Sequence, residues 1–206
     1  MRRDPGWIAA AALLLVLGIG VALGAGVECT CTTTRATNGW CPVHAFGYVG
    51  GVKVTSRWLY EAADAHGHQV DTSTFSCERC KDAIATNGFC SAHRIGFVNK
   101  LAYFSRLTYE LAKGEIRPVR SIACATCRKN SESFGWCARS KVGMVGEVAI
   151  RNRDDFDQAV EALRIFIVAN ATAARCDRCA VAIITDTECP LHGIKYKDGK
   201  LEARAH

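Results

Sequence analysis

The stretch Cys77-Glu-Arg-Cys80-Lys-Asp-Ala-Ile-Ala-Thr-Asn-Gly-Phe-Cys90-Ser-Ala-His93 decides the fold of this chain, because its pattern of thiols and imidazole recurs. The pattern reads C-x2-C-x9-C-x2-H, and all 12 cysteines of the 206 residues fall into four units of this kind. Nine residues separate the second and third cysteine in every unit. Core packing gives no reason for cysteine and histidine to recur at a fixed spacing, so the pattern predicts metal sites.

The candidate ligands of the four units are, in chain order, Cys29, Cys31, Cys41 and His44; Cys77, Cys80, Cys90 and His93; Cys124, Cys127 and Cys137; and Cys176, Cys179, Cys189 and His192. Three thiolates and one imidazole suit the tetrahedral coordination of a structural zinc ion. We therefore predict two to four zinc ions per chain. Iron and copper are the alternatives, because affinity alone does not make a thiolate site selective.

The spacing within each unit also predicts local structure. Asn38-Gly39 and Asn87-Gly88 stand where a short hairpin between the two ligand pairs would turn, and Asn-Gly suits a type I′ turn. The complete units resemble zinc ribbons built from rubredoxin-like knuckles. Cys176-Asp-Arg-Cys179 followed by Cys189-Pro-Leu-His192-Gly193 is similar to that family's C-x2-C and C-P-x-C-G pair, with histidine in place of the last cysteine. The resemblance implies a fold and a metal but no activity, because zinc ribbons serve many functions.

Two of the units are irregular. Cys29-Thr-Cys31 is one residue shorter than the usual turn, so we expect its sulfurs to be splayed and its metal to be held less well. In the third unit Ser140 stands where histidine is expected, and a neutral hydroxyl is a poor zinc ligand. Three interpretations stay open for this unit: no metal, a fourth ligand from elsewhere such as His66 or His68, or an open position that holds water.

The repeat extends beyond the ligands. Two and four residues after each last ligand position stand the apolar pairs Phe46 and Tyr48, Ile95 and Phe97, Val142 and Met144, and Ile194 and Tyr196. This alternation predicts a strand with one buried face. Helices are expected after the first three strands: from about Ser56 to Gly67; through Phe104, Leu107 and Leu111 to near Gly114; and from Asp154 and Asp155 through Phe156, Val160, Leu163 and Ile167.

These elements define the predicted fold class, a small metal-stabilised α+β protein. An N-terminal transmembrane helix precedes four tandem zinc-ribbon-like units, each a β-hairpin plus a strand, with connecting helices after the first three. The predicted segments are 1–28 for the membrane anchor or signal, 29–72, 73–120 and 121–172 for the first three units, and 173–206 for the terminal unit. A period of about 48 residues predicts that neighbouring units pack on one another.

The N-terminal segment predicts where the repeats reside. Arg2 and Arg3 precede an uncharged run from Trp7 to Val27, which is long enough to span a bilayer as a helix. The two arginines favour the cytoplasmic side, which places the C-terminal region on the extracytoplasmic side. The alternative is a cleaved signal peptide and a secreted chain, since Gly24-Ala25-Gly26 offers small residues for cleavage.

Export raises a competing chemistry, because cysteines in an oxidising compartment usually form disulfides. Disulfides or redox-switchable thiols stay an alternative, but they give no reason for histidine to recur three residues after a cysteine. We find no catalytic constellation and expect no enzyme. A net charge of +6 is scattered along the chain, so nucleic acid is an unlikely partner. The leading hypothesis is a membrane-anchored structural zinc protein that serves an unknown protein partner, and the alternatives are metal buffering or transfer, for zinc or copper, and thiol redox chemistry.

Overall fold

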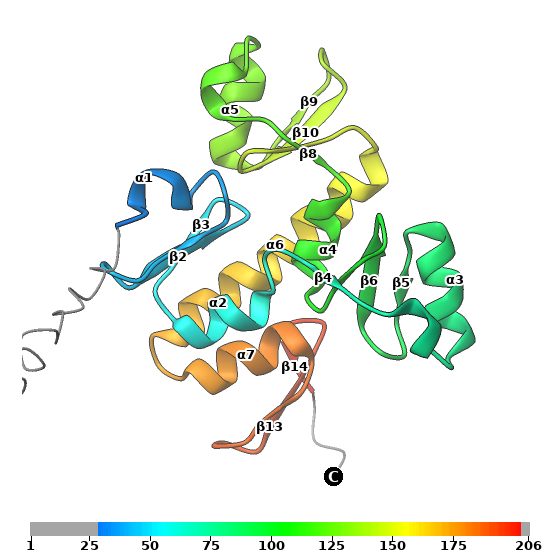
Figure 1. The fold of residues 1–206 in the computed structure, drawn as a ribbon. Helices are drawn as coiled ribbons and strands as arrows, with labels where there is room; N and C mark the ends of the chain where they lie inside the picture. Colours follow the sequence, from blue (N-terminus) through cyan, green and yellow to red (C-terminus); the bar gives the residue numbers. More distant parts are fainter. Residues whose placement is uncertain (1–28, 203–206) are drawn as a thin grey trace, which may run out of the picture.

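The computed structural model describes residues 29–202, so the predicted N-terminal helix at 7–27 lies outside the described residues. Among residues 29–202, no helix combines the length and the apolar character that a membrane crossing requires. The described chain is an α+β protein in which four small antiparallel sheets surround a central group of helices (Figure 1). The α+β class and the repeated small sheets of the prediction are thereby confirmed.

Each sheet belongs to one repeat. The first repeat holds α1 (Cys31–Thr34), β1 (Trp40–Cys41), β2 (Phe46–Val49), β3 (Val52–Val54) and α2 (Arg57–Ala63). The second holds β4 (His68–Gln69), η1 (Thr72–Thr74), α3 (Glu78–Thr86), β5 (Phe89–Cys90), β6 (Ile95–Val98), β7 (Leu101–Tyr103) and α4 (Arg106–Ala112). The third holds β8 (Glu115–Ile116), η2 (Val119–Ser121), α5 (Ala125–Ser133), β9 (Trp136–Cys137), β10 (Val142–Val145), β11 (Val148–Ile150) and α6 (Arg153–Ala173). The fourth holds α7 (Asp177–Thr185), β12 (Glu188–Cys189), β13 (Ile194–Lys197) and β14 (Lys200–Leu201).

Short edge strands tie consecutive repeats together. β4 follows α2 in the chain but pairs with β7, and β8 follows α4 but pairs with β11. The sheet orders are therefore β4-β7-β6-β5 in the second repeat and β8-β11-β10-β9 in the third. Each of these sheets takes one strand from the connection that leads into it, so the segment after α2 or α4 is hydrogen-bonded to the sheet of the repeat that follows.

The predicted hairpin between the two ligand pairs is wrong, because the nine residues between them form mainly a helix in the second, third and fourth repeats and a short helix followed by a turn in the first. In the second repeat α3 begins directly after Cys77 and ends at Asn87, which adopts the left-handed conformation with φ of 54°. The Gly88 amide then donates to the Ala83 carbonyl at 2.7 Å, which closes a helix C-cap. Asparagine tolerates positive φ both in a type I′ turn and at a C-cap, so the Asn-Gly pair fits either structure. The zinc-ribbon resemblance therefore holds for the ligand pattern and not for this segment.

The strands after the last ligand and the three helices that follow them are confirmed. β2, β6, β10 and β13 begin at Phe46, Ile95, Val142 and Ile194. α2 and α4 lie within their predicted helical segments and α6 covers the third, but α2 ends at Ala63, before the predicted end at Gly67, and α4 begins at Arg106, after Phe104. The expectation of one buried face is too simple for β6 and β10. Gly96 and Val98 are buried as well as Phe97, because one face of β6 contacts the cysteine cluster and the other contacts α4.

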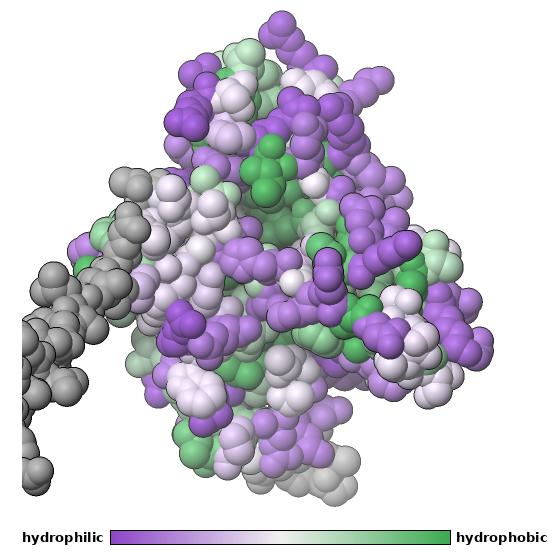
Figure 2. Space-filling view, viewed as in Figure 1, coloured by the Kyte–Doolittle hydropathy of each residue, from purple (hydrophilic) through white to green (hydrophobic). Residues whose placement is uncertain are grey.

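The main core lies at the centre of the molecule and is shared by all four repeats. α6 packs against α7, α4 and α2, and its buried residues include Leu163 and Phe166. Val54 and Leu59 of the first repeat, Leu107 of the second and Ile183 of the fourth join the same apolar cluster. In Figure 1 the four small sheets lie around these helices, and Figure 2 shows hydrophilic residues over much of this face. The expected packing of neighbouring repeats is therefore observed, through one common helical core.

A second repeated contact fixes each central helix to its sheet. The aromatic residue before the third cysteine packs against an aromatic residue on the following helix, and an arginine in the first helical turn lies over both rings. The three sets are Trp40, Tyr60 and Arg57; Phe89, Tyr109 and Arg106; and Trp136, Phe156 and Arg153. These aromatic residues therefore serve packing between sheet and helix.

Candidate metal centres

The ligands of each complete site come from two local structures. The first two cysteines lie at the N-terminus of a helix, where Cys77 is the N-cap of α3 and Cys80 lies in its first turn. Free backbone N–H groups and the helix dipole at this end favour thiolates. The third cysteine ends a short strand, and the histidine follows in a tight turn whose next residue has positive φ, at Ala45, Arg94 or Gly193. The turn brings the imidazole back toward the sulfurs at the helix N-terminus.

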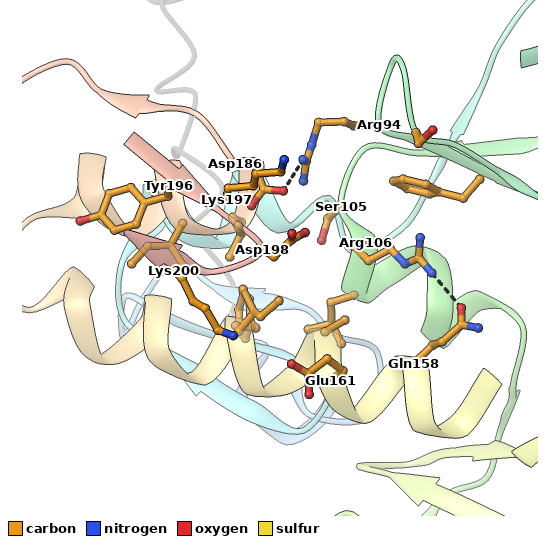
Figure 3. Close-up of a pocket in the computed structure, with 18 of the residues that line it drawn as sticks. Arg94, Ser105, Arg106, Gln158, Glu161, Asp186, Tyr196, Lys197, Asp198 and Lys200 are labelled. Atoms are coloured by element: carbon orange, nitrogen blue, oxygen red, sulfur yellow. Dashed lines mark hydrogen bonds and ion pairs between the residues drawn. The ribbon is translucent and has the colours of Figure 1, made fainter. Parts of the chain in front are cut away.

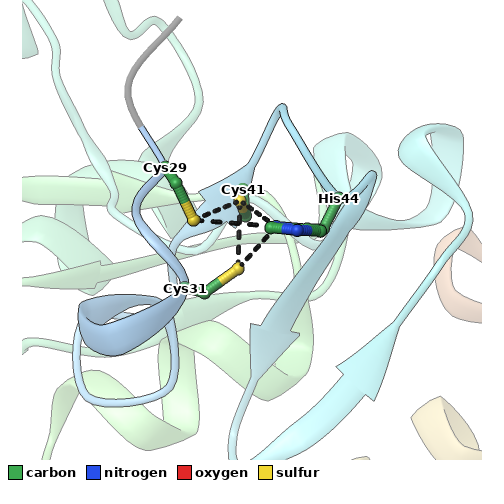
Figure 4. Close-up of side chains that lie close together, drawn as sticks. All are labelled: Cys29, Cys31, Cys41 and His44. Carbon is green, nitrogen blue, oxygen red and sulfur yellow. Dashed lines mark hydrogen bonds between the residues drawn. The ribbon is translucent and has the colours of Figure 1, made fainter.

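The first site is closed despite its short Cys29-Thr-Cys31 segment (Figure 4). The Sγ atoms of Cys29 and Cys31 lie 3.9 and 3.2 Å from Cys41 Sγ, and they lie 3.6 and 3.0 Å from His44 Nδ1. A tetrahedral zinc ion with ordinary bond lengths separates two sulfurs by ~3.8 Å and a sulfur from a nitrogen by ~3.6 Å. The two Cys29 distances match these values and the two Cys31 distances are ~0.6 Å shorter. All four donors lie within 4.8 Å of one another, so the short segment still brings both sulfurs to the same site.

The second and fourth sites repeat this geometry. His93 Nδ1 lies 3.3 Å from Cys80 Sγ and 3.7 Å from Cys90 Sγ, and His192 Nδ1 lies 3.1 Å from Cys179 Sγ and 3.5 Å from Cys189 Sγ. In each of the three complete groups all donor atoms lie within 4.8 Å of one another. The same ring nitrogen is presented each time, because the same tight turn carries the histidine.

In the complete sites the third cysteine is buried and the histidine is exposed. Cys80, Cys90 and Cys189 are buried, whereas His93 and His192 are exposed. Each sulfur cluster has its own small apolar surround, such as Phe97 around the second site. Burial strengthens the interaction between thiolates and a cation, and the exposed imidazole edge gives an ion a route from solvent.

The protein prepares one cysteine of each complete site as a thiolate. Burial raises the pKa of Cys41, but hydrogen bonds with Cys31 and His44 outweigh it and lower the pKa to about 5. The same balance lowers the pKa of Cys189 to about 6, through Cys179 and the backbone of the turn. The partner Cys31 shows the opposite effect, since its hydrogen bond to Cys41 and burial raise its pKa to about 12. The thiols of one site therefore share protons, and a metal ion that binds there displaces them.

The third group contains three thiols and no imidazole. The Sγ atoms of Cys124 and Cys137 lie 3.9 Å apart, and Cys124, Cys127 and Cys137 have all three Sγ atoms within 4.8 Å of one another. His66 and His68 do not complete it: His66 contacts the Thr37 carbonyl, and His68 pairs with Asp64. The interpretation that either histidine supplies the fourth ligand is therefore wrong within the described residues.

Ser140 lies beside the thiols of this third group. A backbone hydrogen bond from Cys127 and then the Ser140 hydroxyl lower the pKa of Cys124 to about 6. A cavity of about 280 Å³ adjoins the group, and its lining includes Cys124, Cys127 and Ser140. The serine thus occupies the position of the histidine in the turn but leaves the volume of an imidazole ring unfilled.

One polar neighbour of the fourth site, the hydroxyl of Tyr196, was not predicted from the sequence. Tyr196 stands four residues after His192, where Phe97 and Met144 stand in their repeats, and was assigned to packing alone. Burial and then a hydrogen bond with Cys179 raise the pKa of Tyr196 to about 12. The offset from the last ligand could have identified this neighbour, because the equivalent side chain faces the sulfur cluster in the second and third repeats.

A larger cavity of about 720 Å³ lies away from the cysteines, between α4, α6 and the fourth repeat (Figure 3). Its floor is apolar and includes Leu107, Phe166 and Ile183. Its rim carries both charge signs: Arg94 pairs with Asp186, and Arg106 Nη2 donates to Gln158 at 2.8 Å. No motif in the sequence pointed to this cavity, because it forms between repeats that are distant in the chain.

Four groups of cysteine and histidine side chains that could hold metal ions are therefore the main chemical feature of residues 29–202. Three of these groups offer four donors each, and the third in chain order offers three. Comparison with known proteins returned no match to any family model, to any curated protein or to any solved structure.

Proposed function

We propose that this chain is a membrane-anchored, exported zinc protein whose metal sites stabilise a non-catalytic scaffold for a protein partner. The observation that carries the proposal is the convergence of three sulfurs and one Nδ1 atom within 4.8 Å in three separate repeats. Thiolate and imidazole donors at the corners of a tetrahedron suit zinc. A structural role fits closed donor sets, because a catalytic zinc ion keeps a coordination position open.

The composition of the clusters favours metal-bound thiolates over disulfide bonds. Each cluster contains three thiols, so one disulfide within it would leave one cysteine unpaired. All twelve cysteines are free in the structure. A disulfide also gives no role to the histidine beside the sulfurs, whereas a tetrahedral ion uses all four donors.

The shared core supports the scaffold role. The helices α2, α4, α6 and α7 hold the four repeats in one arrangement, and the four small sheets lie around these helices. The cavity of Figure 3 is the site that best fits a partner, since an apolar floor with a rim of both signs suits a peptide segment. A polyanion such as nucleic acid would need one dominant sign of charge, so we expect no nucleic-acid partner.

The membrane anchor rests on the sequence alone. The uncharged run from Trp7 to Val27 has the length of a membrane span, and Arg2 and Arg3 would keep its N-terminus on the cytoplasmic side. The repeats would then lie on the extracytoplasmic side. The alternative of signal cleavage predicts a mature chain that begins shortly before Cys29, which protein sequencing of the N-terminus tests directly.

The central experiment measures metal content, free thiols and folding on the full chain, purified anaerobically in mild detergent. We expect three or four zinc ions and few disulfides. When a strong chelator removes the metal, we expect the loss of α1, α3 and α5, the cysteine-bearing helices that lie outside the shared core. Cys90→Ser should lose one zinc ion, whereas Ser91→Ala, one residue away and exposed, should lose none. A chain without metal and with about six disulfides would refute the proposal. Rapid zinc exchange under mild chelation with the fold intact would instead support metal buffering.

A further inference from the structure

The third cysteine group differs from its three counterparts in a way that creates a ligand site. In the other repeats an imidazole fills the fourth corner of the donor set, and at the third group Ser140 and a cavity of about 280 Å³ stand there. This volume is at the lower end of the range for small-molecule sites, so it admits a small ligand only. Cys124 and Cys127 line the cavity, so a ligand inside it can reach an ion held by the three sulfurs.

The walls of this cavity combine apolar and basic character. Ile122, Val142 and Met144 supply apolar surface, and Arg117 and Arg151 supply two positive charges. Glu115 lies between the arginines, since Arg117 Nη2 is 2.7 Å and Arg151 Nη2 is 3.9 Å from its carboxylate. One positive charge is therefore left over beside the cavity, and Arg151, with a side chain 70% exposed, is free to turn toward a bound anion.

Charge balance selects the donor. A divalent ion with three thiolates and a neutral imidazole has a net charge of −1, as in the complete sites. A fourth anionic donor at the third group would make the charge −2, and the surplus arginine charge returns the local total to −1. A thiolate is the anionic donor that completes the four-sulfur set common in structural zinc sites.

We propose that the third group, Cys124, Cys127 and Cys137, holds a metal ion whose fourth position is open to the cavity and takes a small exogenous thiolate. The inference rests on the proposed metal-binding function and adds an exchangeable ligand at one of the four sites. The Ser140 hydroxyl lies beside the sulfurs and leaves the fourth position to an exogenous donor, because a neutral hydroxyl is a poor zinc ligand. The three complete sites, whose fourth corner is an imidazole, should not respond to the same ligand.

Cobalt(II) replacement tests this inference, because the visible absorption of cobalt reports its coordination. The full chain is loaded with cobalt anaerobically and titrated with 2-mercaptoethanol, and acetate and imidazole serve as separate arms. We expect four cobalt ions and a saturable spectral change that corresponds to one of the four sites. Ser140→His should abolish the change while four ions stay bound, and Ser140→Ala should keep the change. Arg151→Ala should weaken thiol binding about 2- to 5-fold, as for the loss of one exposed ionic contact.

Each contrary result has a distinct meaning. Three bound ions with no metal at the third group would overturn the inference and leave the proposed function in place. A thiol response that survives in Ser140→His would assign the response to another site and would also overturn it. A response to acetate or imidazole but not to the thiol would refute the thiolate as ligand. Complete absence of bound metal would refute the inference and the proposed function together.

Discussion

Replacing Gly96 with alanine should destabilise the protein through one steric contact. Gly96 lies in β6, and a Cβ atom placed on it would meet Tyr109 Cδ2 at 2.1 Å and Tyr109 Cγ at 2.2 Å. The ring cannot move aside easily, because the Tyr109 hydroxyl donates to the Asn87 carbonyl at 3.0 Å and Phe89 packs against the ring. Relief therefore requires α4 to shift, and α4 carries Leu107 into the central core.

The expected cost follows from this geometry. Overpacking a core by one methyl group typically costs about 1 to 3 kcal/mol, and a contact that displaces a core helix should reach the upper end. A loss of about 3 kcal/mol corresponds to a fall of about 6 to 12 °C in the melting temperature for a chain of this size. Gly47→Ala should be milder, because the added Cβ would lie 2.8 Å from the Gly39 carbonyl oxygen and 2.9 Å from Tyr60 Cδ2, against 2.1 Å at Gly96.

The fourth repeat supplies the control. Lys195 stands at the position equivalent to Gly96 and is exposed, because no helix of the described residues follows β13 to cover it. Lys195→Ala should therefore change stability by less than about 0.5 kcal/mol. The assay is thermal unfolding of the zinc-loaded proteins, followed by circular dichroism. The double variant Gly96→Ala, Tyr109→Ala should be less destabilised than the sum of the two single variants, by about 1 to 3 kcal/mol. Additive effects, or a Gly96→Ala protein as stable as Lys195→Ala, would refute the steric account.

Three other perturbations test separate contacts. Glu110→Gln should lower the free energy of unfolding by about 2 kcal/mol, as measured by chemical denaturation, because the fully buried carboxylate lies 2.6 Å from Arg106 and 2.7 Å from Lys113. Asn87→Ala should cost about 1 to 2 kcal/mol and Asn87→Gly less, because only alanine is strained at the left-handed C-cap while both lose the side-chain hydrogen bond. In metal-free protein, ultraviolet thiolate absorbance should persist below pH 9 and fall away between about pH 7 and 4, because the pKa of Cys41 is about 5 and that of Cys189 about 6. These depressed pKa values stabilise the fold above the ordinary thiol pKa of 9.0, and the contribution is lost as pH falls through them.

The ligand groups could be predicted from sequence because their signal is local. Two cysteines three residues apart share one helix end, and a cysteine and a histidine three residues apart share one tight turn, so spacing alone brings each pair together. The Asn-Gly dipeptide could not decide between a helix and a hairpin for the nine residues that connect the two ligand pairs. The composition of Glu78–Thr86, with alanine, lysine and aspartate and without an alternating apolar pattern, favours the helix that the structure shows.

Another recurring sequence pattern, besides the cysteines and histidines, shows how α2, α4 and α6 attach to their sheets. Ser56-Arg57, Ser105-Arg106 and Asn152-Arg153 each begin a helix, and an aromatic residue follows three positions after each arginine. Aligning the repeats on their cysteines shows this pattern together with the glycine that each aromatic ring covers. The common core itself was beyond sequence reasoning. An amphipathic pattern identifies the apolar face of α6 but not its partners, and α7 was missed because the hairpin had been assigned to its residues.

In the first three repeats, the strand after the last ligand separates two contributions to stability. One face contacts the metal site, and the other face contacts the helices of the apolar core. In the second repeat Phe97 faces the sulfur cluster, whereas Val98 and Gly96 lie toward α4 and its surroundings. Removing the metal should therefore release α3, whose buried residues Cys80 and Ala83 belong to the sulfur cluster, while α6 and its neighbours keep their own apolar contacts. Hydrogen exchange should show this as rapid loss of protection in α3 before α6. Simultaneous loss in both helices would mean that the ions hold the central core as well, and the layers would then form a single folding unit.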